Sequence, residues 1–378
     1  MNGKNYCITN RSISTTVNHG FRVASAGGQR ILTACFHHRF DPRNTARRPI
    51  MAKGFVDIQN NGWMGIDFTE PGLTLDQVRK ITLDLRARGT VAYCPTLITG
   101  NPEVYQKNFA VIAKAMKDPE IGPHILGIHL EGPFISPEFG AVGAHPKEYV
   151  LAPDIATFDR FQEWAEGNIR ILTVAPERPG CDALISHVTK RGVTVSIGHH
   201  LATDADLTRA VEAGARLCTH VGNGIPNQIH RHENPLWWQL ADDRVTGMFI
   251  TDGHHLPADL IKVALRSKTP NRFIVTSDAS PLAGMPPGKY TIFGTLPVAI
   301  SETGLIYSEK SQSLAGSHAV MMECMNHLAS LGYLSETELW QVGFENQIRL
   351  LGLKAEKFAA LPGPSVHYRN QRFELSSK

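Results

Sequence analysis

The six cysteines of this 378-residue sequence are scattered, and no two of them form a Cys-x-x-Cys pair. Paired-cysteine zinc sites and dithiol redox motifs are therefore excluded, and in a chain of this size we interpret the cysteines as reduced thiols of a cytoplasmic protein. Long hydrophobic runs are missing too. No apolar stretch reaches the roughly 18 residues of a membrane helix, so we expect a soluble chain with no membrane partner.

An excess of one charge sign is also absent, because 38 Lys and Arg stand against 35 Asp and Glu. A nucleic-acid-binding protein would gather basic residues on one face, so we expect no nucleic-acid partner. Residues 1–50 are the exception, with seven arginines against one acid, Asp41. We interpret them as a basic N-terminal segment: a disordered tail, a transit-like peptide, a remnant of a β-sandwich, or translation from upstream of a natural start at Met51.

Short apolar runs separated by helical patterns fill the chain from residue 54 onward, which indicates an α/β protein. Eight such runs read as strands: 54–59, 91–99, 124–131, 169–177, 193–200, 215–223, 245–255 and 272–280. Helical spacing separates several of them, at 75–89, 103–117, 181–191, 204–214 and 257–267. Eight strands with intervening helices predict a (β/α)8 TIM-like barrel. An open doubly wound sheet is the alternative, but no glycine-rich phosphate fingerprint follows the first strand.

The chain continues past the eighth strand with a different pattern. Residues 289–308 alternate like a small β-meander around Gly294 and Gly304, and helices are expected at 317–331 and 335–351. We therefore predict a barrel domain over 51–353, with the β-meander inserted near 288–308, and a C-terminal tail over 354–378.

Polar residues stand where the predicted strands end. Those ends carry Gln59 and Asn61, Glu131, His199 and His200, His220, Asp252 with His254 and His255, and Asp278. A single histidine at a strand end is more often a hydrogen-bonded structural residue than a ligand. Five of eight strands ending in His, Glu or Asp are harder to explain in that way, because all these termini converge on the mouth of one barrel.

One carboxylate and two imidazoles make a three-ligand site for an ion such as zinc, with the fourth position open to water. The metal would lower the pKa of that water toward about 7 and polarise a substrate carbonyl. A nearby carboxylate such as Asp278 can take the proton of the water and pass it to a leaving amine. The pattern thus predicts metal-assisted hydrolysis of an amide or ester, with the substrate left open.

A series of motifs carries a more specific resemblance. In chain order they are GFVDIQNNG, HLEGPF, GAHP, SIGHH, THVGNG, TDGHH, SDASPLAG and LAGS. Over residues 54–352 this order resembles the N-acetylglucosamine-6-phosphate deacetylases of the amidohydrolase superfamily. The resemblance implies a metal-dependent (β/α)8 barrel that releases acetate from a phosphorylated N-acetyl amino sugar. It also implies that Glu131, His199 and His220 bind the metal and that Asp278 is the general base and then the acid.

The resemblance assigns the substrate contacts as well. His145 of GAHP would contact the sugar and the scissile acetyl group. Asn223 and the backbone N–H of Gly224 would hold the phosphate together with Arg231, whose planar guanidinium can bind two of its oxygens. His255 would reach the phosphate of the neighbouring subunit, which implies a homodimer.

Two features depart from the family pattern. Many amidohydrolases carry His-x-His after the first strand for a second metal, whereas this chain has Gln59 and Asn61 there. We therefore expect one divalent ion per subunit, Zn2+ before Fe2+, Co2+ or Mn2+, with both amides binding solvent or supporting the groups around it. Residues 1–50 and the tail show little strand pattern, so the small β-sandwich domain of the family is expected to be reduced or absent.

The substrate is the least specified part of this prediction. N-acetylglucosamine and N-acetylgalactosamine 6-phosphates differ only at C4, and one loop contact could decide between them. The loop at 227–240 is unusual, with Trp237 and Trp238 added to the stretch that carries the phosphate arginine. Another amidohydrolase acting on a different N-acyl compound or cyclic amide is the second hypothesis. A non-catalytic sugar-phosphate-binding barrel is the third.

Overall fold

The computed structural model describes residues 52–294 and 296–376. The prediction made for the basic segment at 1–50 lies outside these residues. Within the described part, no helix is both long and apolar enough to cross a membrane.

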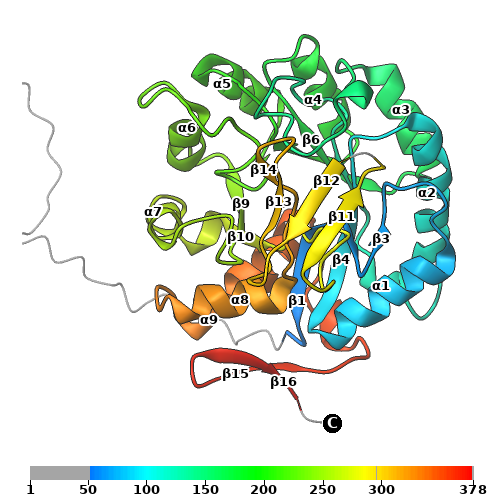
Figure 1. Cartoon of the computed structure of the whole chain (residues 1–378), viewed down its shortest axis with the longest axis vertical. Coiled ribbons are helices and arrows are strands. Elements are labelled where there is room, and N and C mark those ends of the chain that lie inside the picture. The colour runs from blue at the N-terminus through cyan, green and yellow to red at the C-terminus, as the bar shows by residue number, and fades with distance from the viewer. Residues whose placement is uncertain (1–51, 295, 377–378) are drawn as a thin grey trace, which may run out of the picture. The chain divides into compact units, whose positions relative to one another are not determined.

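Eight parallel strands form one sheet in the order β1-β4-β5-β6-β7-β8-β9-β10, which confirms the predicted barrel (Figure 1). The strands are β1 (Phe55–Asn60), β4 (Thr90–Ile98), β5 (Ile128–Glu131), β6 (Ile169–Val174), β7 (Thr194–Ile197), β8 (Leu217–Cys218), β9 (Thr246–Ile250) and β10 (Phe273–Thr276). Nearly all of their residues are buried. Strands covered on both sides are expected to read as continuous apolar runs, and this is why the sequence revealed them.

Helices follow the strands and pack around the barrel. They are α1 (Leu75–Ala87), α2 (Pro102–Met116), α3 (Ile155–Trp164), α4 (Cys181–Thr189), α5 (Asp204–Ala213), α6 (Pro235–Ala241), α7 (Ala258–Lys268), α8 (Met321–Ser330), α9 (Glu336–Trp340) and α10 (Asn346–Leu350). Capping side chains fix the residues at which several of these helices begin. Thr74 caps α1 in a capping box with Gln77, and Thr203 does the same for α5 with Asp206.

The barrel closes at a seam between β1 and β10, the two strands at the ends of the ladder. There the backbone N–H of Asp278 donates to the carbonyl of Gln59 (3.0 Å), and the N–H of Asn61 donates to the carbonyl of Ala279 (2.9 Å). The seam therefore brings the end of the first strand beside the residues that follow the eighth.

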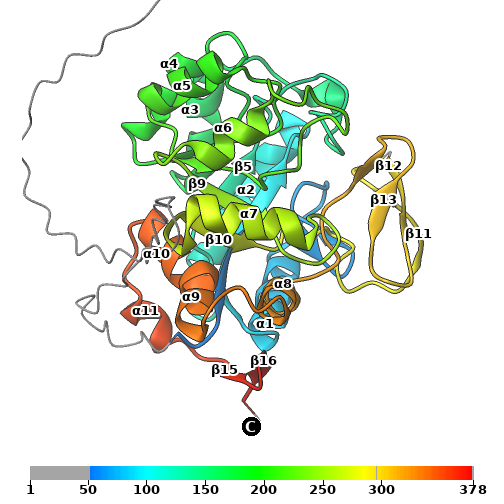
Figure 2. The ribbon, with the colours of Figure 1, turned by 90° about the vertical axis from the view of Figure 1, so that its left-hand side faces the viewer.

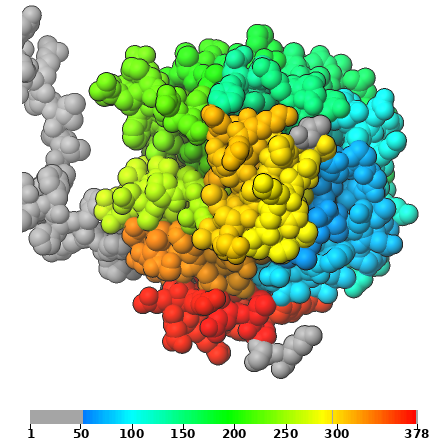
Figure 3. Space-filling view, in the orientation of Figure 1, coloured from blue at the N-terminus to red at the C-terminus, as the bar shows by residue number. Residues whose placement is uncertain are grey.

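A small antiparallel sheet stands on the barrel after β10. It pairs β11 (Gly288–Ile292), β12 (Leu296–Ile300), β13 (Ile306–Ser308) and β14 (Ser313–Leu314), so the predicted meander is present and extends past 308. Figure 2 shows the sheet projecting from one side of the barrel, and Figure 3 shows its residues over the middle of the face seen. Alternate residues of β12 are buried, and they form an apolar cluster with Leu282 and Ala315.

Several elements differ from the sequence-based expectation, among them two helices and a hairpin. Helices α3 and α6 were not predicted, because they lie in stretches that read as long loops. The tail, which we expected to lack strands, forms a hairpin of β15 (Val366–Arg369) and β16 (Arg372–Leu375). Phe373 of the hairpin packs edge-on against Phe55 at the start of β1 (ring centroids 4.9 Å), so the hairpin adheres to the barrel.

Candidate functional site

A cavity of about 710 Å³ opens at the carboxyl ends of the barrel strands. Its wall includes nine of the eleven residues to which the sequence analysis assigned a role in the site: Asn61, Glu131, His145, His199, His220, Asn223, Gly224, His255 and Asp278. Loops after β5, β8 and β14 complete the wall. In a parallel barrel, side chains from strand ends far apart in the sequence meet at this mouth.

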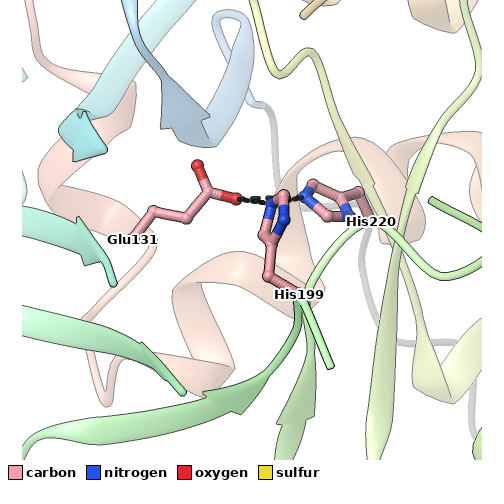
Figure 4. Close-up of side chains that lie close together, drawn as sticks. All are labelled: Glu131, His199 and His220. Atoms are coloured by element: carbon pink, nitrogen blue, oxygen red, sulfur yellow. Dashed lines mark hydrogen bonds and ion pairs between the residues drawn. The ribbon is translucent and has the colours of Figure 1, made fainter. Parts of the chain in front are cut away.

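Glu131, His199 and His220 point at one another at the floor of the cavity (Figure 4). Nε2 of His220 lies 3.0 Å from Oε1 of Glu131 and 3.0 Å from Nε2 of His199, and Nε2 of His199 lies 3.3 Å from the same oxygen. All three side chains are buried. Ligands about 2.0–2.1 Å from a tetrahedral ion are spaced about 3.3 Å apart, so a triangle of this size suits such an ion.

The hydrogen bond of His199 supports this fit. Its Nδ1 lies 2.8 Å from the carbonyl oxygen of Ala141, so Nδ1 carries the proton and Nε2 presents a lone pair to the other two groups. Burial alone would raise the pKa of Glu131, but hydrogen bonds and charge from both histidines hold it well below its usual value. The carboxylate is therefore ionised. A carboxylate and an imidazole lone pair facing one point are what a divalent cation requires.

Asp278 lies across the cavity floor and is itself buried. Burial, with the charge of Glu131 as the next cause, raises the pKa of Asp278 to about 7. A cation held by Glu131 would offset that charge and lower the pKa of Asp278 again. With or without the cation, the carboxylate form can accept a proton from water and return it to a leaving group.

Two side-chain amides at the end of β1, one in the strand and one directly after it, hold this carboxylate in place. Nε2 of Gln59 donates to Oδ1 of Asp278 (3.0 Å) and to Oε1 of Glu131 (2.8 Å). Nδ2 of Asn61 donates to the same Oδ1 of Asp278 (2.7 Å). With Oδ1 occupied by two donors, Oδ2 is the oxygen available for proton exchange.

His145 presents a donor to the cavity. The backbone N–H of Thr99 donates to its Nδ1 (3.3 Å), and the hydroxyl of Thr99 lies 2.9 Å from the same atom. A nitrogen that accepts a hydrogen bond carries no proton, so the proton is on Nε2. Burial, and then the charge of His199, hold the pKa of His145 well below its usual value. His145 is therefore a neutral donor, and its ring centroid lies 4.2 Å from that of His199.

Asn223, Gly224 and His255 line the same cavity. Gly224 has a left-handed backbone (φ +63°) and passes so close to the metal-ligand candidates that a Cβ there would lie 2.9 Å from Cε1 of His220. Nδ1 of His255 donates to Oδ2 of Asp252 (2.8 Å), which turns its Nε2 away from that carboxylate. Within one chain, His255 thus belongs to the wall of its own cavity.

Other predicted residues lie elsewhere. Arg231 is exposed on the loop between β8 and α6, outside the cavity wall, and its carbonyl accepts from Nε1 of Trp237 (2.9 Å). His200 is buried behind the site with its Nε2 2.9 Å from the side-chain amide of Gln239. His254 donates to the carbonyl of Thr303 (2.9 Å), away from the metal-ligand candidates.

Three residues of the site adopt backbone conformations that the sequence does not signal. His199, His220 and Asp278 have φ values of +52°, +26° and +48°, in a region that residues other than glycine rarely occupy. Such strain is typical of functional sites, where the surrounding structure enforces it. Sequence reasoning also missed Thr99, which belongs to none of the motifs, and the pairing of Asp252 with His255, because a motif such as TDGHH does not show which of its side chains form hydrogen bonds.

Comparisons with known proteins agree on one family. The chain is 31% identical over 336 residues to the N-acetylglucosamine-6-phosphate deacetylase of Danio rerio, covering 85% of this chain and 79% of that protein. It is 27% identical over 315 residues to the N-acetylgalactosamine-6-phosphate deacetylase of Escherichia coli O157:H7, covering 83% and 81%.

Among solved structures, the chain resembles a mutant N-acetyl-D-glucosamine-6-phosphate deacetylase from Mycobacterium smegmatis in complex with N-acetyl-D-glucosamine-6-phosphate. The TM-score is 0.73 at 29% identity, covering 80% of this chain and 78% of that one. A scan against models of protein families found no match.

Proposed function

The chain belongs to the N-acetylglucosamine-6-phosphate deacetylase family of amidohydrolases, and from that membership we propose that it hydrolyses N-acetyl-D-glucosamine 6-phosphate to D-glucosamine 6-phosphate and acetate. The observation that carries the proposal is the meeting of Glu131, His199, His220 and Asp278 at the floor of one cavity. A carbonyl placed there would lie among a cation site, a proton acceptor and a neutral donor.

In the proposed reaction, Asp278 transfers the proton and His145 donates a hydrogen bond to the carbonyl oxygen. A water oxygen attacks the acetyl carbonyl carbon, the carbon–nitrogen bond breaks, and the nitrogen leaves as an amine. Asp278 takes a proton from the water through Oδ2 and returns it to the leaving nitrogen, while Gln59 and Asn61 hold Oδ1. His145 donates from Nε2 to the carbonyl oxygen as negative charge develops on it.

Glu131, His199 and His220 would hold one divalent cation, and we propose Zn2+. An ion bound there would acidify water and polarise the acetyl carbonyl. The choice of zinc is supported by two imidazoles and one carboxylate at tetrahedral spacing, a donor set that this ion favours. Fe2+, Co2+ and Mn2+ accept the same donors.

The phosphate would lie beside Asn223, Gly224 and His255, with Arg231 supplied by a second copy of the chain. Among the described residues that line the cavity there is no lysine or arginine, whereas Arg231 is exposed outside it. A guanidinium suits a phosphate dianion because its planar fork can donate two parallel hydrogen bonds to it. We therefore propose a homodimer in which the arginine of one subunit completes the phosphate site of the other.

N-acetylgalactosamine 6-phosphate is the second candidate substrate, because a relative named for that activity matches 83% of the chain. For the compartment, we propose the cytoplasm. Four buried free cysteines among the described residues, such as Cys94 and Cys218, fit a reducing environment.

Acetate release tests the proposal directly. N-acetylglucosamine 6-phosphate, its galacto epimer and unphosphorylated N-acetylglucosamine are compared, with metal content measured on the same sample. Phosphate-dependent release with about one ion per chain supports the proposal and ranks the epimers. Bound metal without release from any of the three would contradict the substrate. Restored activity on mixing an Arg231→Ala variant with an Asp278→Asn variant would support the shared phosphate site, because hybrid dimers then contain one intact site.

A further inference from the structure

Asp57 is a buried carboxylate in the middle of β1 that the proposed reaction does not use. It is fully shielded from solvent, although it lies in a strand whose other residues are mostly apolar. Burial raises the pKa of its carboxyl group, and hydrogen bonds from Ser277, Thr276 and Gln59 oppose that rise, so these partners indicate its role.

The partners of Asp57 lie on both sides of the barrel seam. On its own strand, the N–H of Gln59 donates to Oδ1 (3.3 Å). Across the seam, Oδ1 accepts from the hydroxyl of Thr276 (3.0 Å) and the N–H of Ser277 (3.1 Å), and Oδ2 accepts from the hydroxyl of Ser277. One carboxylate therefore binds the two residues that directly precede Asp278.

The backbone of Asp278 directly follows the residues that Asp57 binds. Its own N–H donates to the carbonyl of Gln59 (3.0 Å), and its backbone has a strained φ of +48°. A residue in such a conformation keeps it only when the surrounding structure enforces it. Asp57 accepts hydrogen bonds from Thr276 and Ser277, which directly precede the strained residue. Gln59, which also donates to Asp57, donates from its side chain to Oδ1 of Asp278.

We propose that Asp57 is a positioning residue for the general base: by tying Ser277 and Gln59 together across the seam, it sets the place of the Asp278 carboxylate relative to the metal-ligand candidates. This inference rests on the proposed role of Asp278. A misplacement of about 1 Å in a catalytic group can lower turnover on the order of 100-fold, so a loosened anchor has a measurable effect.

The test compares Asp57→Ala, which removes all four acceptor contacts, with Asp57→Asn, which keeps one acceptor oxygen. Acetate release from N-acetylglucosamine 6-phosphate is measured on the metal-loaded enzyme. We expect kcat to fall about 10- to 100-fold in Asp57→Ala and less in Asp57→Asn. KM and metal content should stay unchanged, because Asp57 accepts from the backbone of Gln59 and does not contact the side-chain amide that reaches Glu131.

Asn346→Ala is the matched structural control. Asn346 is also buried and also fastens β10, but at its other end, where Nδ2 donates to the carbonyls of Phe273 and Pro270 (both 2.7 Å). We expect this variant to lose thermal stability and keep its kcat. A loss of kcat in Asp57→Ala no larger than in Asn346→Ala would overturn the inference.

A double-mutant cycle separates positioning of the base from general damage. In an Asp278→Asn background, Asp57→Ala should cause no further loss of kcat, since the group it positions is gone. The same loss in both backgrounds would contradict the inference. If Asp57→Ala does not fold, Ser277→Ala removes one contact and should also lower kcat at constant KM. Full turnover in Asp278→Asn alone would instead contradict the proposed reaction.

Discussion

Asn61 donates a hydrogen bond of 2.7 Å to Oδ1 of Asp278, across the seam that closes the barrel. The two residues are 217 positions apart in the chain, and they meet only because the first and eighth strands are neighbours. An amide at this position occupies one carboxylate oxygen and leaves the other for proton exchange. A histidine at this position could turn its ring nitrogen to an ion instead.

Replacing Asp278 by Asn should lower kcat by on the order of 100-fold or more, because the amide cannot accept the proton of water. The metal should stay bound, since Asp278 is outside the Glu131, His199 and His220 triangle. Turnover and metal content on the same preparation check this. Wild-type turnover in the variant would remove Asp278 from the reaction.

Gly224→Ala should reduce metal occupancy. The added Cβ would lie 2.9 Å from Cε1 of His220 and 3.2 Å from the backbone nitrogen of His199, so both ligand candidates must shift. Gly352→Ala is the matched control, because Gly352 has nearly the same backbone (φ +64°) with no atom within 4 Å of the new Cβ. Metal content after dialysis distinguishes the two. Equal occupancy would show that the ligand triangle tolerates the displacement.

Arg231→Ala should raise KM for the phosphorylated sugar and leave unphosphorylated analogues little changed. The reason is that a guanidinium contributes binding only where a phosphate accepts from it. Arg244→Ala is the control, since Arg244 is an exposed arginine paired with Asp242 on the segment after α6. An equal rise in KM for phosphorylated and unphosphorylated substrates would mean that Arg231 stabilises the loop and does not bind the phosphate.

The fold could be predicted because a barrel buries its strands on both sides, so each one appears as an apolar run. The sequence failed to predict the bounds of some strands and the presence of the short hairpin. Strand β8 has only two residues in the ladder, whereas nine were expected, because the backbone turns sharply at His220. The tail hairpin shows only a weak alternation of apolar and polar residues. Each of its strands has one face against the barrel and the other exposed, but four residues are too few to make that alternation clear in the sequence.

The sequence predicted which residues make up the site, but it did not predict how they are arranged. Strand-end positions and the family resemblance named the residues that meet in the cavity. The hydrogen bonds that orient them come from residues to which the sequence assigned no role, such as Thr99 behind His145 and Asp57 across the seam. These contacts depend on which strands are neighbours and on exact distances. Arg231 is the opposite case. The family resemblance assigned it a role in the site, but its side chain is not part of the cavity wall of its own chain.

Asp67 should make the protein less stable as the pH rises through neutrality. Burial, with the charge of Glu70 adding to it, raises the pKa of Asp67 to about 7. The folded state therefore binds this proton more tightly than the unfolded chain, where an Asp titrates near 3.9. Stability from this group is fully present below pH 4 and is lost as the pH rises through 7.

Asp67→Asn removes that titration while its amide oxygen can still accept from the N–H of Thr69, as Oδ1 of Asp67 does at 2.6 Å. Between pH 5 and pH 8 the wild type should lose about 2–3 kcal/mol of unfolding free energy relative to the variant, at about 1.4 kcal/mol for each pKa unit. Urea unfolding at both pH values measures it. Asp84→Asn, at an exposed carboxylate of α1, should follow the wild type. Parallel pH profiles for the wild type and Asp67→Asn would mean that Asp67 is ionised in the fold at no cost.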